Sequence, residues 1–321
     1  MQFAFEAFVT GIVCDAGRAA FALGDGTVRW EGGQMTQAHD GAILCCQLHP
    51  SGNGVITGGD DGRLVYSRPE ATTVMGEVKG GWIDALATSP ESGLVAFSSG
   101  KVVRLLDSAE GKFDRRFDHS SSVSDLAFDP KGRRLAAATY GGVALWYARI
   151  AEQKPAMLRW AGSHGRVVFT PDGRFVISCM QEAVLHVWRL SDGRQAPVAA
   201  DYDTKTRSMA FAQGGAWLAT SGSRRAILLP LTGKDGPLDR QPLALDLEEE
   251  GVVVQVAALG SRVFMGLDSG KILSLNLETQ RQVQLKTPPG PPISALAILD
   301  NDRLAWGDEA GGAGILDLPV T

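Results

Sequence analysis

Short runs of alternating hydrophobic and polar residues follow one another along most of the chain. The clearest unit extends from His39 to Ser67, where one alternating run leads to a Pro-Ser-Gly turn, a second run, an Asp-Asp-Gly turn and a third run. Alternation with a period of two is typical of half-buried β-strands, and glycine-containing turns between such runs indicate hairpins. This unit therefore predicts three short antiparallel strands.

The same pattern recurs about every 40 residues, with clear copies at His119–Ala148 and Gly165–Leu190 and weaker copies elsewhere. The predicted repeats cover approximately residues 1–38, 39–78, 79–118, 119–160, 161–200, 201–247, 248–287 and 288–321. A less regular fourth run fits between several of them, and about four strands in 40 residues is the spacing of propeller blades. Because no long segment rich in proline, serine or charge separates the repeats, we predict one all-β domain, 1–321, folded as a single closed β-propeller.

Three repeats resemble the WD-repeat family. The matching features are a histidine before the first strand, a proline- and glycine-containing turn after it, and a tryptophan that ends the third strand; they occur at His39, His119, Pro130–Gly132, Pro171–Gly173, Trp146 and Trp188. The resemblance implies a β-propeller of the WD-repeat type. It also implies a non-catalytic scaffold for protein–protein interaction, whose docking face is formed by the loops at one end of the sheets.

The repeats also depart from that family. Family members often form a buried hydrogen-bonded set of His, Ser or Thr, Asp and Trp in each blade, and no repeat here carries a complete set. His39 and Asp61 lack the terminal tryptophan, whereas His119 and Trp146 have Tyr140 near the position of the aspartate. We therefore expect the blades to depend more on apolar packing between sheets than on polar networks.

The number of blades follows from the number of repeats. Eight repeats favour eight blades, and a seven-bladed ring with one irregular unit is the alternative. Little sequence remains to complete the last blade, because the chain ends soon after Leu318. We predict that Phe3 to Phe5 supply part of its outer strand, or that the eighth blade has three strands.

Composition narrows the functional classes. The chain has 321 residues, of which 44% are hydrophobic and 21% charged, so it can bury a substantial core. A formal net charge of −5 argues against nucleic acid as a partner. The first basic residue is Arg18, and no apolar run is long enough to span a membrane, so we expect a cytoplasmic protein without a signal segment or membrane contact.

The chemistry-bearing residues do not converge on a reactive site. The glycines lie beside strands, as turn residues do, and no GxSxG nucleophile motif occurs. The histidines are dispersed over different repeats, and the cysteines, Cys14, Cys45, Cys46 and Cys179, lack a CxxC spacing. We therefore expect no enzyme, metal or cofactor. The alternative is a propeller hydrolase or lyase with a metal or small substrate in the central channel, for which Asp84 and Asp125 in first strands are the candidate carboxylates.

The loops before first strands and between second and third strands contain a group of aromatic and basic residues. Aromatic residues and arginine are enriched at binding hot spots, so we predict a protein-binding surface there. Its residues are Trp82, Tyr140, Trp160, Tyr202, Lys205, Arg207, Arg224 and Arg225. An acidic protein or peptide would suit this surface. As an alternative to a binding role, Trp82 and Trp160 cover neighbouring blades. As an alternative to a general scaffold, the chain is a dedicated subunit of one larger complex.

Overall fold

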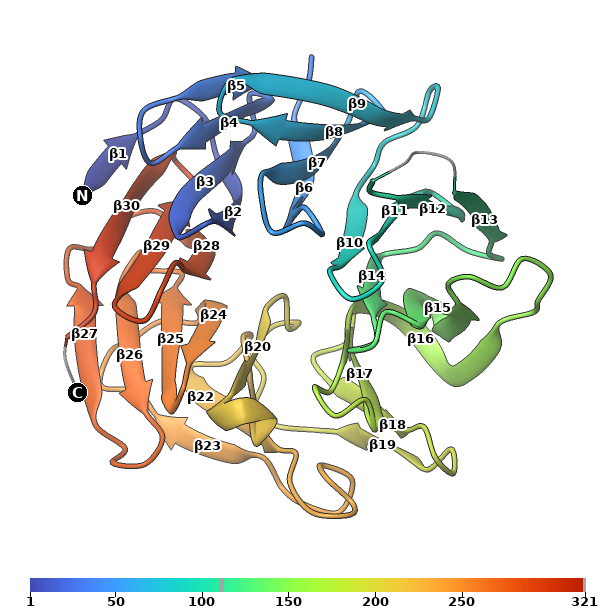
Figure 1. Ribbon diagram of the computed structural model, residues 1–321. Coiled ribbons are helices and arrows are strands. Elements are labelled where there is room, and N and C mark those ends of the chain that lie inside the picture. The colour runs from blue at the N-terminus through green and yellow to red at the C-terminus, as the bar shows by residue number, and fades with distance from the viewer. Residues whose placement is uncertain (110–112, 320–321) are drawn as a thin grey trace. The chain divides into compact units, whose positions relative to one another are not determined.

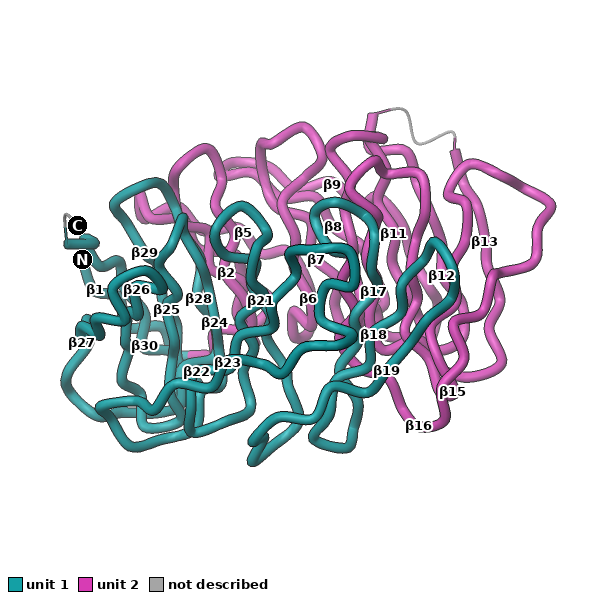
Figure 2. The backbone as a smooth tube through the Cα atoms, turned by 90° about the horizontal axis from the view of Figure 1, so that it is seen from below, with its two compact units in different colours: residues 1–6, 170–321 teal, residues 7–169 magenta. Residues whose placement is uncertain are grey.

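The structure is a computed structural model that describes residues 1–109 and 113–319 (Figure 1). Those residues form β-strands and one short 3₁₀ turn at Gln213–Gly215, so the predicted all-β class is confirmed. Residues 110–112 of the third predicted repeat and residues 320–321 of the eighth lie outside the described part. The chain divides into two compact units, residues 1–6 with 170–321 (unit 1) and residues 7–169 (unit 2), which Figure 2 colours separately.

Unit 2 contains fifteen of the assigned strands. They follow the chain in order as β2 (Val9–Asp15), β3 (Arg18–Leu23), β4 (Thr27–Trp30), β5 (Met35–Gln37), β6 (Ile43–Leu48), β7 (Val55–Gly59), β8 (Arg63–Arg68), β9 (Ala71–Glu77), β10 (Ala85–Ser89), β11 (Leu94–Ser99), β12 (Val102–Asp107), β13 (Asp114–Asp118), β14 (Asp125–Phe128), β15 (Arg134–Tyr147) and β16 (Ala156–Phe169). β2–β5, β6–β9 and β10–β13 each form a four-stranded antiparallel sheet.

Unit 1 contains the first strand of the chain and all strands after β16. These are β1 (Gln2–Ala4), β17 (Phe175–Met180), β18 (Leu185–Arg189), β19 (Gln195–Val198), β20 (Met209–Ala212), β21 (Trp217–Thr220), β22 (Arg225–Pro230), β23 (Leu243–Asp246), β24 (Val253–Leu259), β25 (Arg262–Leu267), β26 (Ile272–Asn276), β27 (Gln282–Lys286), β28 (Ile293–Ile298), β29 (Arg303–Asp308) and β30 (Gly312–Asp317). β20–β23 and β24–β27 form four-stranded sheets, and β28–β30 form another with β1.

Apolar packing between consecutive sheets builds the core of each unit. In unit 2, first strands lie against one another, β2 against β6, β6 against β10 and β10 against β14. Leu94 and Leu105 of one sheet share a buried cluster with Leu135 and Trp146 of the next. Removing this apolar surface from water supplies the main driving force for folding. That this packing contributes more to stability than the polar networks stays a prediction.

The number of sheets differs from the favoured number of blades. The described residues form six four-stranded sheets and one six-stranded sheet, β14–β19, and this arrangement is read as seven blades, the alternative given beside eight. The predicted repeats 119–160 and 161–200 share the six-stranded sheet. The reason is that β15 and β16 each run through 14 residues where the pattern predicts a break.

Gly142 allows β15 to fold back on itself without interruption. The backbone N–H of Ala148 donates to the carbonyl of Arg133, so the two ends of this strand lie side by side. Gly142 has a φ of +139°, and the register against β16 shifts between Tyr140 and Gly142. A Cβ atom at Gly142 would lie 2.1 Å from the carbonyl oxygen of Leu158. Only glycine fits this place in the sheet.

Replacing Gly142 with alanine is therefore expected to lower the free energy of unfolding by about 2 kcal/mol or more, from backbone strain together with the clash. Gly141 provides a matched control, because its φ is +85° but nothing lies within 4 Å of a Cβ placed there. Gly141→Ala should cost only about 1 kcal/mol from the positive φ. Urea denaturation measures both values, and equal losses in the two variants would contradict this explanation.

The N-terminal strand completes the last sheet. β1 pairs with β30 in antiparallel register, with Gln2 opposite Gly314 and Phe3 opposite Ala313. The backbone N–H of Ile315 donates to the carbonyl of Met1 at 2.9 Å. Of the two predicted alternatives, a strand at Phe3 to Phe5 and a three-stranded blade, the structure agrees with the first, with the strand at Gln2–Ala4.

Candidate functional site

Backbone hydrogen bonds hold the loops at one end of the sheets in unit 2. The N–H of Ile83, before β10, donates to the carbonyl of Gly59 in the preceding sheet at 3.0 Å. The N–H groups of His119 and Val123, before β14, donate to the carbonyls of Lys101 and Gly100 at 2.9 and 2.8 Å. Each loop before a first strand thus rests on the turn between the second and third strands of the previous sheet. We call this side of unit 2 the loop end.

His39 anchors the loop end of the second sheet through a buried polar set. Its Nδ1 lies 2.9 Å from Asp61 and its Nε2 lies 2.8 Å from the Thr57 hydroxyl. Ser67 occupies the end of the third strand, where the family resemblance implies a tryptophan, and its buried hydroxyl has no hydrogen-bond partner among the described residues. His39 and Asp61 thus lie together as members of the family set, and Ser67 stands where that set has its tryptophan.

His119 uses a different acceptor because its repeat lacks the aspartate. Its Nδ1 lies 3.3 Å from the Lys101 carbonyl, and its Nε2 lies 3.0 Å from Nε1 of Trp146. An indole nitrogen can only donate, so Nε2 of His119 accepts and the ring is neutral, with its proton on Nδ1. Tyr140, near the aspartate position, is not part of this set, and 69% of the residue is exposed to solvent.

Burial lowers the pKa of His119 below its usual 6.5, against weaker opposing effects from the Lys101 and Phe117 backbones. Since the unfolded chain binds this proton at higher pH than the folded chain, stability should be lost as pH falls from about 7 to about 5. His119→Gln, which does not titrate, should lose less stability over the same range. Urea denaturation at several pH values measures the difference, and parallel curves for the two proteins would contradict it.

Three predicted aromatic residues lie at the loop end of unit 2. Trp82, between β9 and β10, is 66% exposed, and Tyr140, in the bend of β15, is 69% exposed. Trp160, in β16, is 38% exposed, and its carbonyl accepts a hydrogen bond from Nε2 of His164 at 3.1 Å. Tyr140 pairs with Ser163 across the sheet, which brings it close to Trp160. We call these three residues the aromatic surface. The exposure of Trp82 argues against a role in covering a neighbouring blade.

The other five predicted residues belong to unit 1, and most of them are engaged within it. Tyr202 is half-buried, its hydroxyl lies 2.8 Å from that of Thr220, and burial raises its pKa to about 12. Lys205 donates to the Gln181 side chain at 3.1 Å, whereas Arg207 is exposed. Tyr202 therefore offers a partner less contact area than the sequence predicted.

Acidic neighbours neutralise Arg224 and Arg225. Arg225 forms ion pairs with Asp201 at 3.0 Å and with Asp246 at 2.8 Å, and Arg224 lies 3.6 Å from Asp203. The sequence prediction missed these carboxylates, although Asp201 and Asp203 stand in the same loop as Lys205 and could have been counted with it. The charge available to a partner in unit 1 is thus smaller than the arginines suggest.

One of the two carboxylates proposed for channel chemistry, Asp125, has protein partners, and burial raises the pKa of the other, Asp84. Asp125 is buried, accepts the N–H of Val167 at 2.9 Å and lies 3.5 Å from Arg166. Burial raises the pKa of Asp125, although Arg166 and the backbone N–H groups of Val167 and Leu126 oppose the shift. Within residues 1–109 and 113–319, no group of three or more His, Cys, Asp or Glu side chains could hold a metal ion. Asp125 thus links the first strands of two predicted repeats.

The cysteines lie in strands, where Cys179 is buried and Cys14, Cys45 and Cys46 are half-buried. Burial raises the pKa of Cys46 to about 12 and that of Cys45 still further. A thiol with a raised pKa is poorly nucleophilic, because the thiolate is the reactive form. Among the described residues, no helix is long and apolar enough to cross a membrane.

Comparison with known proteins supports the class that the fold indicates. The family model for WD40, described as WD domain, G-beta repeat, matches residues 33–65 and 111–146. Sqt1 of Saccharomyces cerevisiae is similar in structure, with a TM-score of 0.80 and 12% identity over 99% of this chain and 98% of that chain. A computationally designed protein, Ika8, has a TM-score of 0.78 and 18% identity over 98% of both chains. No curated protein matches the sequence.

The chain is thus a β-propeller in which two segments, residues 33–65 and 111–146, match the WD40 repeat. The resemblance inferred from the histidine, turn and tryptophan positions is confirmed. At these identities the two structures indicate the fold alone.

Proposed function

We propose that this protein is a non-catalytic scaffold that binds another protein or a peptide through the aromatic surface of unit 2. The observation that carries the proposal is the exposure of Trp82 and Tyr140, each about two-thirds accessible, on loops fixed by backbone hydrogen bonds. Large rigid aromatic side chains on a fixed backbone lose little conformational entropy when a partner covers them, which favours binding.

The basic residues of unit 1 have a smaller role in this proposal. Exposed ion pairs contribute little to affinity and mainly tune the rate of encounter. Since Arg224 and Arg225 already have acidic neighbours, a partner would gain little by pairing with them. The proposed surface therefore consists of the aromatic residues of unit 2.

Site-specific photo-crosslinking tests the proposal in the cells that make the protein. A photoreactive phenylalanine at Tyr140 is expected to crosslink a partner protein. Tyr147 is a matched control, because it belongs to the same strand, is 56% exposed and lies at the end of β15 opposite to the Tyr140 bend. A partner crosslinked equally from both positions, or from Tyr147 only, would contradict the proposed surface.

The crosslinked product also separates two forms of the proposal. One partner in constant ratio to the chain would indicate a dedicated subunit of a larger complex. Several partners that compete for Tyr140 would indicate a general scaffold.

A further inference from the structure

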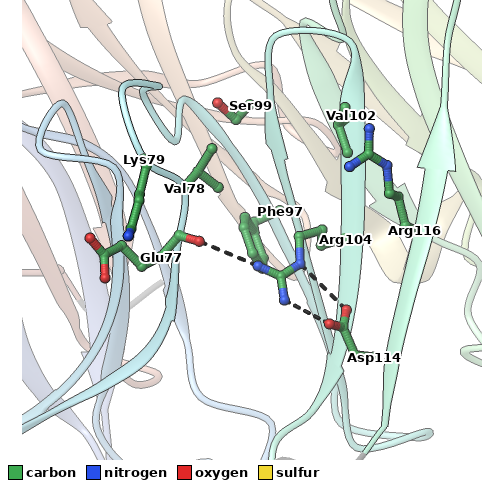
Figure 3. A pocket seen from close by; sticks show the side chains of 9 residues that line it. All are labelled: Glu77, Val78, Lys79, Phe97, Ser99, Val102, Arg104, Asp114 and Arg116. Carbon is green, nitrogen blue, oxygen red and sulfur yellow. Dashed lines mark hydrogen bonds and ion pairs between the residues drawn. The ribbon is translucent and has the colours of Figure 1, made fainter.

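A cavity of about 540 Å³ lies in unit 2, beside the loop that carries Trp82 (Figure 3). One wall is formed by Glu77, Val78 and Lys79, at the end of β9 and the start of the following loop. The opposite wall is one face of the sheet β10–β13. The sequence prediction missed this cavity, because its two walls come from different repeats.

The sheet wall carries a row of cross-strand neighbours. Phe97 of β11 lies opposite Arg104 of β12, which lies opposite Arg116 of β13. The guanidinium of Arg104 lies over the Phe97 ring at 5.6 Å and forms an ion pair with Asp114 at 2.7 Å. It also donates to the carbonyl of Glu77 at 3.4 Å. Arg104 is thus fixed in place, and Asp114 balances its charge.

Two further cations line the cavity on opposite sides of Phe97 and Arg104, Lys79 on one side and Arg116 on the other (Figure 3). Arg116 forms an ion pair with Asp118 at 2.8 Å, but both side chains are about two-thirds exposed, so the pair is weak and exchangeable. Glu77 and Asp114 also line the cavity, and Asp114 already balances the charge of Arg104. An anionic group placed between Lys79 and Arg116 would compete with Asp118 for Arg116 and would also pair with Lys79.

We propose that the cavity binds an acidic side chain of an extended partner segment, while an adjacent residue of that segment packs on Trp82. This inference rests on the proposed function and adds the chemistry of the partner. Lys79 and Trp82 are three residues apart, so their Cα atoms are at most roughly 10 Å apart, a span that a few extended residues can cover. The acidic side chain selects the partner by charge, and Trp82 supplies apolar contact area.

Fluorescence anisotropy with defined probes tests the inference. The probes are a labelled peptide Gly-Glu-Glu-Leu-Glu-Glu-Gly and its counterparts with Gln or Lys in place of Glu. We expect the Glu peptide to bind the full chain about tenfold more tightly than the Gln peptide. The Lys peptide should not bind. Higher salt should weaken binding of the Glu peptide.

Charge-reversal variants locate the binding. The double variant Lys79→Glu/Arg116→Glu should lose about tenfold in affinity for the Glu peptide. The matched control is Lys131→Glu/Arg133→Glu, which makes the same charge change at two exposed positions in the turn between β14 and β15. The control should bind as the natural chain does. Thermal unfolding of all three proteins verifies that each is folded.

The outcomes separate this inference from the proposed function. Binding that is weakened by Trp82→Ala but not by Lys79→Glu/Arg116→Glu would overturn the acidic site and leave the aromatic surface supported. Equal affinity for the Glu and Gln peptides, or no binding of any probe, would also overturn the acidic site, whereas crosslinking at Tyr140 judges the proposed function independently.

Discussion

Truncation of Trp146 to alanine is expected to lower the free energy of unfolding by about 3–5 kcal/mol, the usual range for a large aromatic residue removed from a core. Trp146 is only 5% exposed and stacks on Phe117, with ring centroids 4.4 Å apart and planes 8° from parallel. Its indole N–H also donates to His119. The substitution therefore removes packing between two sheets together with the hydrogen bond that holds a loop.

Trp146→Phe separates the two contributions. Phenylalanine keeps an aromatic ring against Phe117 but leaves Nε2 of His119 without its donor, which should cost about 1 kcal/mol plus a smaller packing loss. Urea denaturation of both variants gives the comparison. If Trp146→Ala were no more destabilising than Trp146→Phe, the packing of Trp146 on Phe117 would contribute little to the free energy of unfolding.

Deletion of residues 1–5 is expected to lower the free energy of unfolding by about 3 kcal/mol, since several backbone hydrogen bonds worth about 1 kcal/mol each are lost. The bonds include Ile315 N–H to Met1 and Phe5 N–H to Gly311, at 2.9 and 2.8 Å. The deletion also removes the stacked pair Phe3–Phe5, whose ring centroids are 5.8 Å apart. Thermal and urea denaturation measure the loss.

A synthetic peptide with the sequence of residues 1–6 provides the control for this deletion. If β1 acts by pairing with β30, the free peptide should restore part of the lost stability as its concentration rises, because an extended segment can add to an open sheet edge. A deletion variant as stable as the full chain, or one that the peptide leaves unchanged, would contradict the role of β1.

Local patterns were enough to predict the strands and several of their contacts. Alternation and turn residues located the sheets, and the family resemblance placed His39 beside Asp61. Because the last repeat lacked an outer strand, a strand at Phe3 to Phe5 was one of two predictions for it, and the observed strand is Gln2–Ala4. In each of these cases the information lies within one repeat or at the ends of the chain.

Features that depend on backbone groups or on contacts across long connections could not be predicted in this way. The Lys101 carbonyl replaces the missing aspartate of the His119 set, and a carbonyl leaves no trace in the sequence. Neutralisation of Arg225 depends on Asp246, at the far end of a long connection. The shared six-stranded sheet likewise follows from strands that continue past the expected breaks, as β15 does at Gly142.

The most direct test of the account is capture of a partner by immobilised protein from the cells that make it. We predict that the natural chain and the control Tyr147→Ala/Ile150→Ala, which removes two exposed apolar residues away from the loop end, capture the same protein. The variant Trp82→Ala/Tyr140→Ala/Trp160→Ala should lose that protein, by about a hundredfold or more, with little change in its melting temperature. Capture of the same protein in the same amount by this folded triple variant would contradict the account.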